Sequence, residues 1–284
     1  MYKLELGVSI DCFGLKWLDG GKYQITQKHE FVDEMTKDMR ANGISTMELS
    51  TAGCWNLQEE NENYFAVKEY VKIIKRSGVK LNSVHLPANL PFWDFGTLNE
   101  EKRKLSVERA KWAIGHFEEG EPNYFIFHPG TTTSQDPGVR EKMLEALAKS
   151  MEEICDSTSA TICIENMPRG ELINKASEAV WLLERVPKLM MVVDVNHPLL
   201  DTTEDFILAV GDRIKCLHIS DRDSEREKHW LPSRGILDWN KVIGALEKVK
   251  YQGKFTYEVA LERDNVSIFD VKENYEKLFS EYNK

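Results

Sequence analysis

The sequence predicts one (β/α)8 barrel, a TIM barrel of the α/β class, that spans residues 1–284 as a single domain. Two observations support this fold. Eight short apolar runs alternate with longer segments of helical periodicity, and several runs are apolar throughout, such as residues 190–193. Continuous apolarity is typical of parallel strands that are covered on both faces. An open doubly wound sheet is the alternative, but no Gly-x-Gly-x-x-Gly turn follows the first run and no Pro/Gly/Ser-rich linker divides the chain.

Each apolar run is expected to form a strand and each segment between runs an amphipathic helix. The expected strands are 4–10, 46–50, 80–86, 124–128, 161–165, 190–195, 214–220 and 255–259. The expected helices lie near 31–43, 62–77, 100–118, 138–156, 176–186, 203–210, 239–252 and 267–281. In the helix that begins near Trp239, Asp238 stands at the N-cap position and Gly253 follows as a stop signal.

The composition limits the kinds of partner. With 37 basic and 47 acidic residues the net charge is −10, which disfavours nucleic acid as the main partner because binding to a phosphate backbone depends on clustered Lys and Arg. The five scattered cysteines form no Cys-x-x-Cys pair and indicate a reducing compartment. Neither a signal peptide nor a membrane-spanning apolar run is visible, so we expect a cytoplasmic protein without a membrane partner. A homo-oligomer stays an open alternative to a monomer.

Polar residues that can perform chemistry stand at or near the carboxyl ends of the later apolar runs. They are His85, His128, Glu165, Asp194, His197, His218 and Glu258. In a barrel, the carboxyl ends of all strands meet at one mouth. Taken singly, each residue has an ordinary structural explanation, such as a hydrogen-bonded histidine or a carboxylate that pairs with an arginine. The shared position at the ends of six runs favours a common site.

The energetics of such a cluster favour a metal ion. Carboxylates and imidazoles gathered at the edge of an apolar core shift one another's pKa values and are costly to bury unless a cation neutralises them. Three carboxylates with one imidazole form a hard ligand set, which suits Mn²⁺, Mg²⁺ or Co²⁺, with Zn²⁺ as a further candidate. The sequence therefore predicts at least one divalent metal ion.

Four segments carry a resemblance to a known family. They are Ile-Glu-Asn at 164–166, Asp-Val-Asn-His at 194–197, Leu-His-Ile-Ser-Asp at 217–221 and the segment 229–239. Together they resemble the xylose-isomerase-like barrel superfamily, and within it the sugar phosphate isomerases and epimerases. The resemblance extends from the first strand to the last helix. It implies a metal held by the residues matching Glu165, Asp194, His218 and Glu258, of which Glu165 and Glu258 also exchange protons with the substrate.

The related apurinic-site endonucleases hold three metals, and their further ligands match other residues of this chain. The resemblance thus implies additional metal-binding or substrate-binding roles for His85, His128, His197, Glu227 and His229, with Glu227 where the endonucleases carry Asp. Relatives usually read Pro-Gly-Glu-Gly where this chain has Ser233 and Arg234. The loss of that glycine is expected to change the loop, since glycine adopts positive φ freely. Arg234 is either a solvated loop residue or a grip for a substrate phosphate or carboxylate.

An aromatic loop supplies a candidate substrate surface. Trp93 lies in Pro-Phe-Trp-Asp-Phe at 91–95, which is expected to cover an apolar face of a sugar. Trp17, Trp55 and Trp230 also follow expected strands, in segments that carry no assigned role.

These observations predict a metal-dependent sugar or sugar-phosphate isomerase or epimerase that works through a metal-stabilised enediolate, with Glu165 and Glu258 transferring the protons. Three alternatives stay open at this point. A sugar or cyclitol dehydratase would use the same groups to expel water. A multi-metal phosphoesterase would resemble the endonucleases, and a sugar-binding barrel would lack catalysis.

Overall fold

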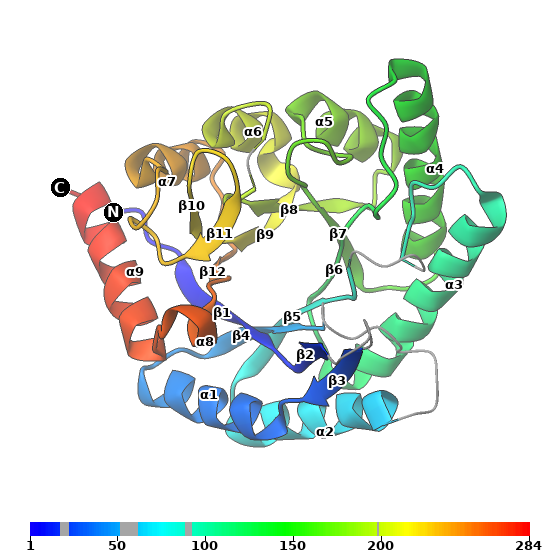
Figure 1. The fold of residues 1–284 in the computed structure, drawn as a ribbon. Helices are drawn as coiled ribbons and strands as arrows, with labels where there is room; N and C mark the ends of the chain where they lie inside the picture. Colours follow the sequence, from blue (N-terminus) through cyan, green and yellow to red (C-terminus); the bar gives the residue numbers. More distant parts are fainter. Residues whose placement is uncertain (18–22, 52–61, 89–92, 198) are drawn as a thin grey trace.

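A computed structural model describes residues 1–17, 23–51, 62–88, 93–197 and 199–284. It contains an eight-stranded parallel sheet in the order β12-β1-β4-β5-β6-β7-β8-β9. The two outer strands of this order meet through a parallel bridge between Ile219 and Tyr257, and Glu258 N–H donates to the Ile219 carbonyl at 3.1 Å. The sheet therefore closes into the predicted barrel, with helices packed around it (Figure 1).

The barrel strands agree with the predicted runs to within two residues at every end. They are β1 (Glu5–Asp11), β4 (Thr46–Ser50), β5 (Lys80–His85), β6 (Tyr124–Phe127), β7 (Thr161–Glu165), β8 (Met190–Asp194), β9 (Ile214–His218) and β12 (Lys254–Tyr257). Most of their residues are buried, including the whole of β4. Burial on both faces explains why these strands appear in the sequence as continuous apolar runs.

The predicted helices also form. They are α1 (His29–Ala41), α2 (Glu62–Ser77), α3 (Glu100–Phe117), α4 (Pro137–Cys155), α5 (Ala176–Arg185), α6 (Thr203–Val210), α7 (Trp239–Lys248) and α9 (Ile268–Tyr282). Asp238 caps α7 as expected, accepting the Lys241 N–H at 3.2 Å. The predicted stop at Gly253 is wrong, because α7 ends at Lys248 and Lys250 already has a left-handed backbone with φ of 57°.

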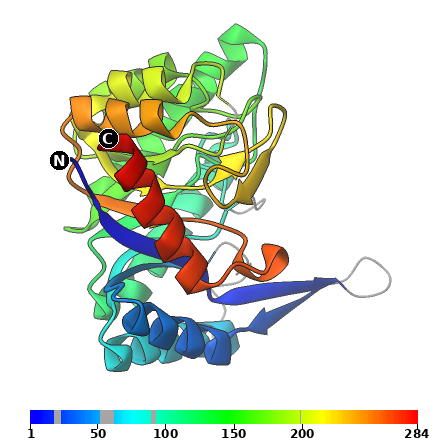
Figure 2. The same cartoon turned by 90° about the vertical axis from the view of Figure 1, so that its left-hand side faces the viewer.

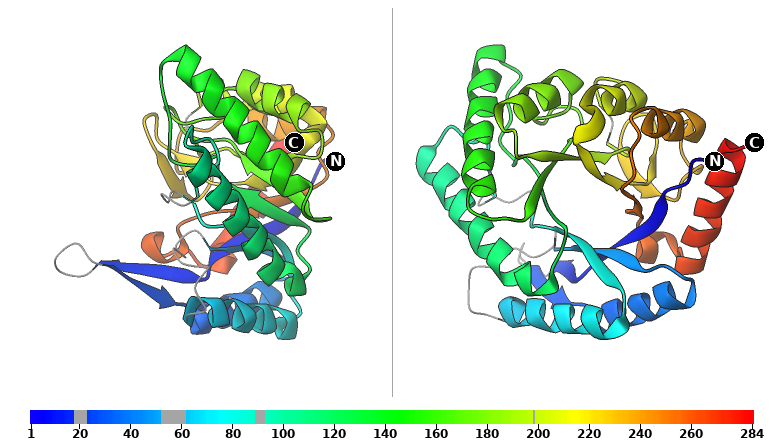
Figure 3. Two further views of the ribbon diagram at one scale, coloured as in Figure 1. Left: turned by 90° about the vertical axis from the view of Figure 1, so that its right-hand side faces the viewer. Right: turned by 180° about the vertical axis from the view of Figure 1, so that it is seen from behind.

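Three short elements at one end of the barrel were not predicted. A hairpin of β2 (Phe13–Trp17) and β3 (Tyr23–Gln27) lies between β1 and α1, and a second hairpin of β10 (Asp221–Arg222) and β11 (Glu227–Trp230) follows β9. Helix α8 (Leu261–Asp264) follows β12. All three follow the carboxyl ends of barrel strands. The β2–β3 hairpin projects from that end, whereas the two termini lie together at the other end (Figures 2 and 3).

The main hydrophobic core joins the barrel strands to the helices, and a second, smaller cluster lies on β6 to β9. Helix α1 buries Val32 and Met39 against the main core, with Phe31 and Met35 half-buried beside them, as the helical stripe predicts. Four cysteines, Cys12, Cys155, Cys163 and Cys216, are buried free thiols, and Cys54 lies outside the described residues. Within the described part of the chain, no helix is both long and apolar enough to cross a membrane.

Candidate metal centre

Four polar side chains from four strand ends converge at the carboxyl-terminal mouth. Glu165 ends β7, Asp194 ends β8, His218 ends β9 and Glu258 directly follows β12. One ligand atom from each lies within 4.8 Å of the others. The parallel barrel explains the convergence, because it brings all carboxyl ends of its strands to one face.

Glu165 occupies the middle of this cluster. Its Oε1 lies 3.1 Å from Nδ1 of His218, and its Oε2 lies 3.1 Å from Nε2 of His85 and 3.2 Å from Nε2 of His128. His85, His128 and Glu165 thus form a second group that shares Glu165 with the first. Both groups are drawn from the residues that the sequence singled out.

His197 and Glu227 complete the wall beside Asp194. Nε2 of His197 lies 3.2 Å from Oδ2 of Asp194 and 3.1 Å from Oε2 of Glu227. Glu227 is on β11, in the hairpin that sequence analysis did not predict. On the same strand, Nδ1 of His229 lies 3.6 Å from Oε2 of Glu258. The hairpin therefore delivers two of the predicted residues to the cluster.

Backbone carbonyls fix the tautomers of three imidazoles. A carbonyl oxygen can only accept, so each Nδ1 that approaches one must carry the proton. The Nδ1 atoms of His85, His197 and His229 donate to the carbonyls of Leu86, Asn166 and Glu258, at 2.8, 2.6 and 3.1 Å respectively. In the neutral rings this leaves Nε2 as the atom with a free lone pair, and Nε2 of His85 and of His197 faces the carboxylates.

Glu48, which sequence analysis did not select, lies beneath the cluster. This residue of β4 is fully buried, and its Oε1 lies 3.1 Å from Nε2 of His218. Its carboxylate also accepts hydrogen bonds from Ser9 and Ser83. The sequence did contain a signal for this residue, because a glutamate in the middle of a short buried strand is rare unless it is paired.

The surroundings of the two candidate catalytic carboxylates shift their pKa values in opposite directions. Burial by itself raises the pKa of Glu165, but the charges of His218 and His128 and their hydrogen bonds outweigh burial and hold this pKa well below its usual range. At Glu258 burial prevails over His218 and His229 and raises the pKa to about 7. One carboxyl group thus stays ionised while the other can hold a proton near neutral pH, which is the pattern of acid–base pairs.

The pKa values of the imidazoles are also shifted in opposite directions. Burial opposes the charged form of each ring, but Glu165 prevails at His85 and raises its pKa to about 9. Asp194 and Glu227 likewise raise the pKa of His197 to about 10, against the effect of burial. At His128 burial wins over Glu165 and the pKa is lowered. In the metal-free protein, protons on several rings therefore take the place of a cation in neutralising the carboxylates.

The cluster fits a divalent cation. Oδ2 of Asp194 is buried and has no hydrogen-bond partner among the described residues, although Nε2 of His197 approaches it to 3.2 Å. Oδ1 of Asp194 accepts the Asn196 N–H at 2.7 Å. A buried carboxylate oxygen without a hydrogen bond is costly, and a cation would satisfy it. Three carboxylates and one imidazole are a hard ligand set suited to Mn²⁺, Mg²⁺, Co²⁺ or Zn²⁺.

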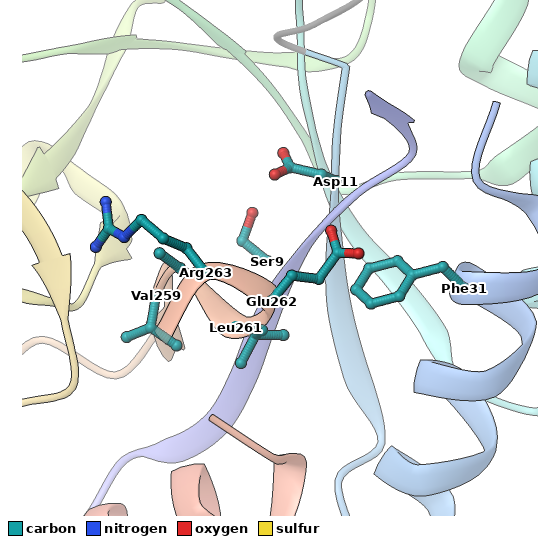
Figure 4. A pocket seen from close by; sticks show the side chains of 8 residues that line it. Ser9, Asp11, Phe31, Val259, Leu261, Glu262 and Arg263 are labelled. Atoms are coloured by element: carbon teal, nitrogen blue, oxygen red, sulfur yellow. The ribbon is translucent and has the colours of Figure 1, made fainter. Parts of the chain in front are cut away.

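A cavity of about 330 Å³ opens directly onto the cluster. Its walls are His85, Ala88, His128, Glu165, Met167, Pro168, Glu171, His197, Glu227, His229 and Glu258. A neighbouring hollow of about 240 Å³ lies between the end of β1 and the β12–α8 turn, with Asp11, Phe31 and Glu262 around it (Figure 4). The first cavity holds the predicted site residues and has the size of a small-ligand site.

Neither of the two predicted substrate-binding side chains lines this cavity. Trp93 is only 3% exposed and packs its ring edge-on against Phe95, so it belongs to the core below the loop. Arg234 is exposed on the loop after β11, where its charge acts on Asp264 and Asp270. Trp55 and the side chain of Trp17 lie outside the described residues.

The loop that carries Arg234 contains a left-handed turn at Ser233, where relatives usually have glycine. Ser233 has φ of 69°, and its N–H donates to Oδ2 of the buried Asp221 at 2.9 Å. The indole N–H of Trp239 donates to the same oxygen at 3.1 Å. Gly235 is required here, because a Cβ would lie 2.2 Å from the Arg222 carbonyl oxygen. Ser233 thus adopts a left-handed backbone conformation in a turn that the buried Asp221 holds.

Fold and cluster together define a (β/α)8 barrel with a carboxylate–histidine candidate metal centre at its mouth. The chain belongs to the xylose isomerase-like TIM barrel family, whose model matches residues 37–278. An uncharacterized protein of Methanocaldococcus jannaschii is 29% identical over 68% of this chain and 69% of its own length. Fructoselysine 3-epimerase of Shigella flexneri is 24% identical over 57% of this chain and 61% of its own length. A crystal structure of a D-tagatose 3-epimerase-like protein matches with a TM-score of 0.70 at 20% identity, covering 99% of this chain and 98% of that one. This last likeness shows a shared fold.

Proposed function

We propose that the protein is a divalent-metal-dependent sugar isomerase or epimerase. The observation that carries the proposal is the convergence of Glu165, Asp194, His218 and Glu258, with one ligand atom from each within 4.8 Å of the others. Similarity to a fructoselysine 3-epimerase and to a D-tagatose 3-epimerase-like protein supports the same class of reaction. A cation bound by these four residues would supply positive charge to the substrate oxygens beside the carbon that loses its proton.

Glu165 and Glu258 are the proposed proton-transfer groups. Both line the cavity, so both can reach a substrate carbon next to a carbonyl group. One carboxylate removes the carbon-bound proton and the other returns a proton to the same or the neighbouring carbon. Transfer from opposite faces gives an epimer, whereas transfer along one face gives aldose–ketose isomerisation. Because the two groups share His218 as a neighbour, their titrations are coupled and neither is assigned separately as acid or base.

The remaining wall residues bind and orient the substrate. His197 and Glu227 stand together at 3.1 Å on one side of the cavity, and His229 stands beside Glu258. These groups can donate to and accept from sugar hydroxyls. The wall also carries Glu171, so carboxylates come from several directions. We therefore expect a neutral or amino-bearing sugar to bind better than a sugar phosphate, whose charge the carboxylates repel.

The test combines metal content with exchange of a carbon-bound proton. Elemental analysis of the purified protein and of a Glu165→Ala variant should find about one Mn, Co, Mg or Zn per wild-type chain and a loss in the variant. The metal-loaded protein is then incubated in D2O with a panel of free ketoses, fructoselysine and ketose phosphates, and followed by NMR. Deuterium at the carbon next to the carbonyl, together with an epimer or isomer, is the expected result.

Other outcomes would overturn the proposal in identifiable ways. A product lighter by one water would indicate a dehydratase. Two or three Zn per chain, without sugar turnover, would favour the multi-metal phosphoesterase, for which His85, His128 and Glu165 form a second ligand group. A wild-type protein that takes up no metal after supplementation would leave a sugar-binding barrel as the better account.

A further inference from the structure

We propose that Glu48 is the positioning residue of the metal centre, because it holds the ring of His218 with Nδ1 turned toward Glu165 and Glu258. This inference rests on the metal-binding part of the proposed function. Glu48 does not line the cavity and is not assigned a contact with the substrate.

The position of Glu48 is itself fixed from three strands. Its Oε1 accepts the Ser9 hydroxyl of β1 at 2.9 Å, and its Oε2 accepts the Ser83 hydroxyl of β5 at 2.7 Å. Nε2 of His218, on β9, lies 3.1 Å from Oε1 and 3.3 Å from Oε2. All four side chains point into the barrel interior and are at most 7% exposed. The carboxylate therefore has no room to rotate away from the imidazole.

The geometry dictates which nitrogen of His218 faces the cation. An ionised carboxylate can only accept, so Nε2 of His218 carries a proton toward Glu48. The lone pair of the neutral ring is then on Nδ1, which lies 3.1 Å from Oε1 of Glu165 and 3.4 Å from Oε2 of Glu258. Nδ1 is thus the coordinating atom, and the buried carboxylate behind the ring increases its basicity.

Glu48 differs in charge from the groups behind three other imidazoles of the site. His85, His197 and His229 donate Nδ1–H to backbone carbonyls, which are neutral. His218 instead faces an ionised carboxylate, that of Glu48, on the side of the ring away from the cavity. A purely structural carboxylate would need only hydrogen bonds, whereas a positioning carboxylate is also expected to strengthen metal binding through its charge.

The experiment measures Mn²⁺ affinity in the full-length protein by isothermal titration calorimetry. Glu48→Gln keeps the shape and an acceptor oxygen but removes the charge, and we expect it to weaken Mn²⁺ binding roughly 10-fold to 100-fold. Ser83→Ala removes one donor to Glu48 without touching His218, and a smaller weakening of the same sign is expected. This second variant keeps the test decisive if Glu48→Gln folds poorly.

Glu153→Gln is the matched control. Glu153 pairs with the buried Arg103 at 2.8 Å on the outer helices and contacts none of the four proposed ligands. This variant should reduce thermal stability but leave the Mn²⁺ dissociation constant unchanged. In the Zn²⁺-loaded wild-type protein, NMR should also show a slowly exchanging Nε2 proton on His218 that is lost or shifted in Glu48→Gln.

Wild-type Mn²⁺ affinity in both Glu48→Gln and Ser83→Ala would overturn the inference while leaving the proposed function intact. Coordination of Zn²⁺ through Nε2 of His218 would overturn it as well. Sugar turnover is not part of this readout, so a failure to find the substrate would contradict the proposed reaction without affecting the role of Glu48. A wild-type protein that binds no metal would overturn both.

Discussion

Oε2 of Glu258 lies 3.4 Å from Nδ1 of His218, the nitrogen that Glu165 also approaches from the side of β7. Both carboxylates therefore face one imidazole nitrogen and, between them, the space where a cation and the reacting carbon would lie. A carboxylate in such a position has two tasks, to hold the cation and to move a proton. A glutamate-to-glutamine substitution removes the charge but keeps the shape of the side chain, so it tests these two tasks without disturbing the fold.

Glu258→Gln is expected to abolish turnover of the sugar substrate, because the amide neither coordinates a cation strongly nor accepts the proton. Loss of a general base alone costs about 10²-fold to 10⁴-fold in rate. Glu165→Gln should have an effect at least as large, since Glu165 also contacts His85 and His128. The rates are measured by NMR at saturating Mn²⁺, with circular dichroism to check folding. Retention of most activity by a folded variant would exclude the role given to that residue.

The thermal stability of the metal-free protein should fall as the pH rises from about 6.5 to about 10. In the folded state the pKa is about 9 for His85 and about 10 for His197, both above the ordinary value of 6.5. Between these limits the folded state binds more protons than the unfolded state, so the free energy of unfolding decreases with rising pH. The slope amounts to about 1.4 kcal/mol per pH unit for each ring that differs.

Added Mn²⁺ should remove this decline, because metal binding requires deprotonated ligands and strengthens as the pH rises. The measurement is a melting curve at each pH, with chelator or with Mn²⁺. His197→Asn provides the comparison, since it should flatten the decline in the metal-free protein. A metal-free melting temperature that stays constant or rises from pH 6.5 to 10 would contradict the imidazole charges described above.

Much of the fold was predictable because the physical signals were local. Burial on both faces produces apolar runs such as β8, and the N-cap at Asp238 satisfies a backbone donor of α7. The site residues were predictable in part for a geometric reason. Barrel closure brings strand ends together, so Glu165, Asp194 and His218 could be placed at one mouth from sequence position alone.

The parts that were not predicted depend on contacts distant in sequence. The β10–β11 hairpin has only a two-residue first strand and is held by Asn196, whose side chain accepts the N–H groups of Lys228 and His229. The role of Glu48 depends on partners 39 and 170 residues away. Trp93 is buried in the main hydrophobic core, which a loop-like sequence does not reveal. Such contacts appear only once the barrel is closed.

Arg140 and Glu178 form a buried ion pair that holds the β7–α5 loop, and breaking it should be costly. Nε of Arg140 lies 2.5 Å from Oε1 of Glu178, and Oε2 of Glu178 accepts the N–H of Ile173, whose φ is 60°. Glu178→Ala leaves the buried guanidinium without its carboxylate partner, although it still donates to neutral groups such as Oδ1 of Asn174, and should lower the free energy of unfolding by about 3–5 kcal/mol. Urea denaturation measures the change.

The control for this pair is Glu276→Ala, which removes the exposed ion pair between Lys3 and Glu276. An exposed pair contributes about 0–1 kcal/mol, so the two variants should differ clearly in their denaturation midpoints. Equal effects would show that the Arg140–Glu178 pair does not stabilise the loop. Double substitution of Arg140 and Glu178 by leucine should recover part of the loss, because no charge is then left buried without a partner.

Ser233→Gly is expected to stabilise the protein by roughly 0.5–1 kcal/mol. Ser233 adopts φ of 69°, where a residue with a Cβ is strained and glycine is not. Part of the gain is lost, since glycine has more conformational entropy in the unfolded chain. The N–H of Ser233 that donates to Asp221 is retained in the variant, so the turn itself should not change.

Ser224→Gly is the control. Ser224 is also exposed but its backbone lies outside the left-handed region, so this variant should lose stability or stay unchanged. The stability of both variants is measured by chemical denaturation. If Ser233→Gly loses as much stability as Ser224→Gly, the side chain of Ser233 stabilises this turn by more than its left-handed backbone costs.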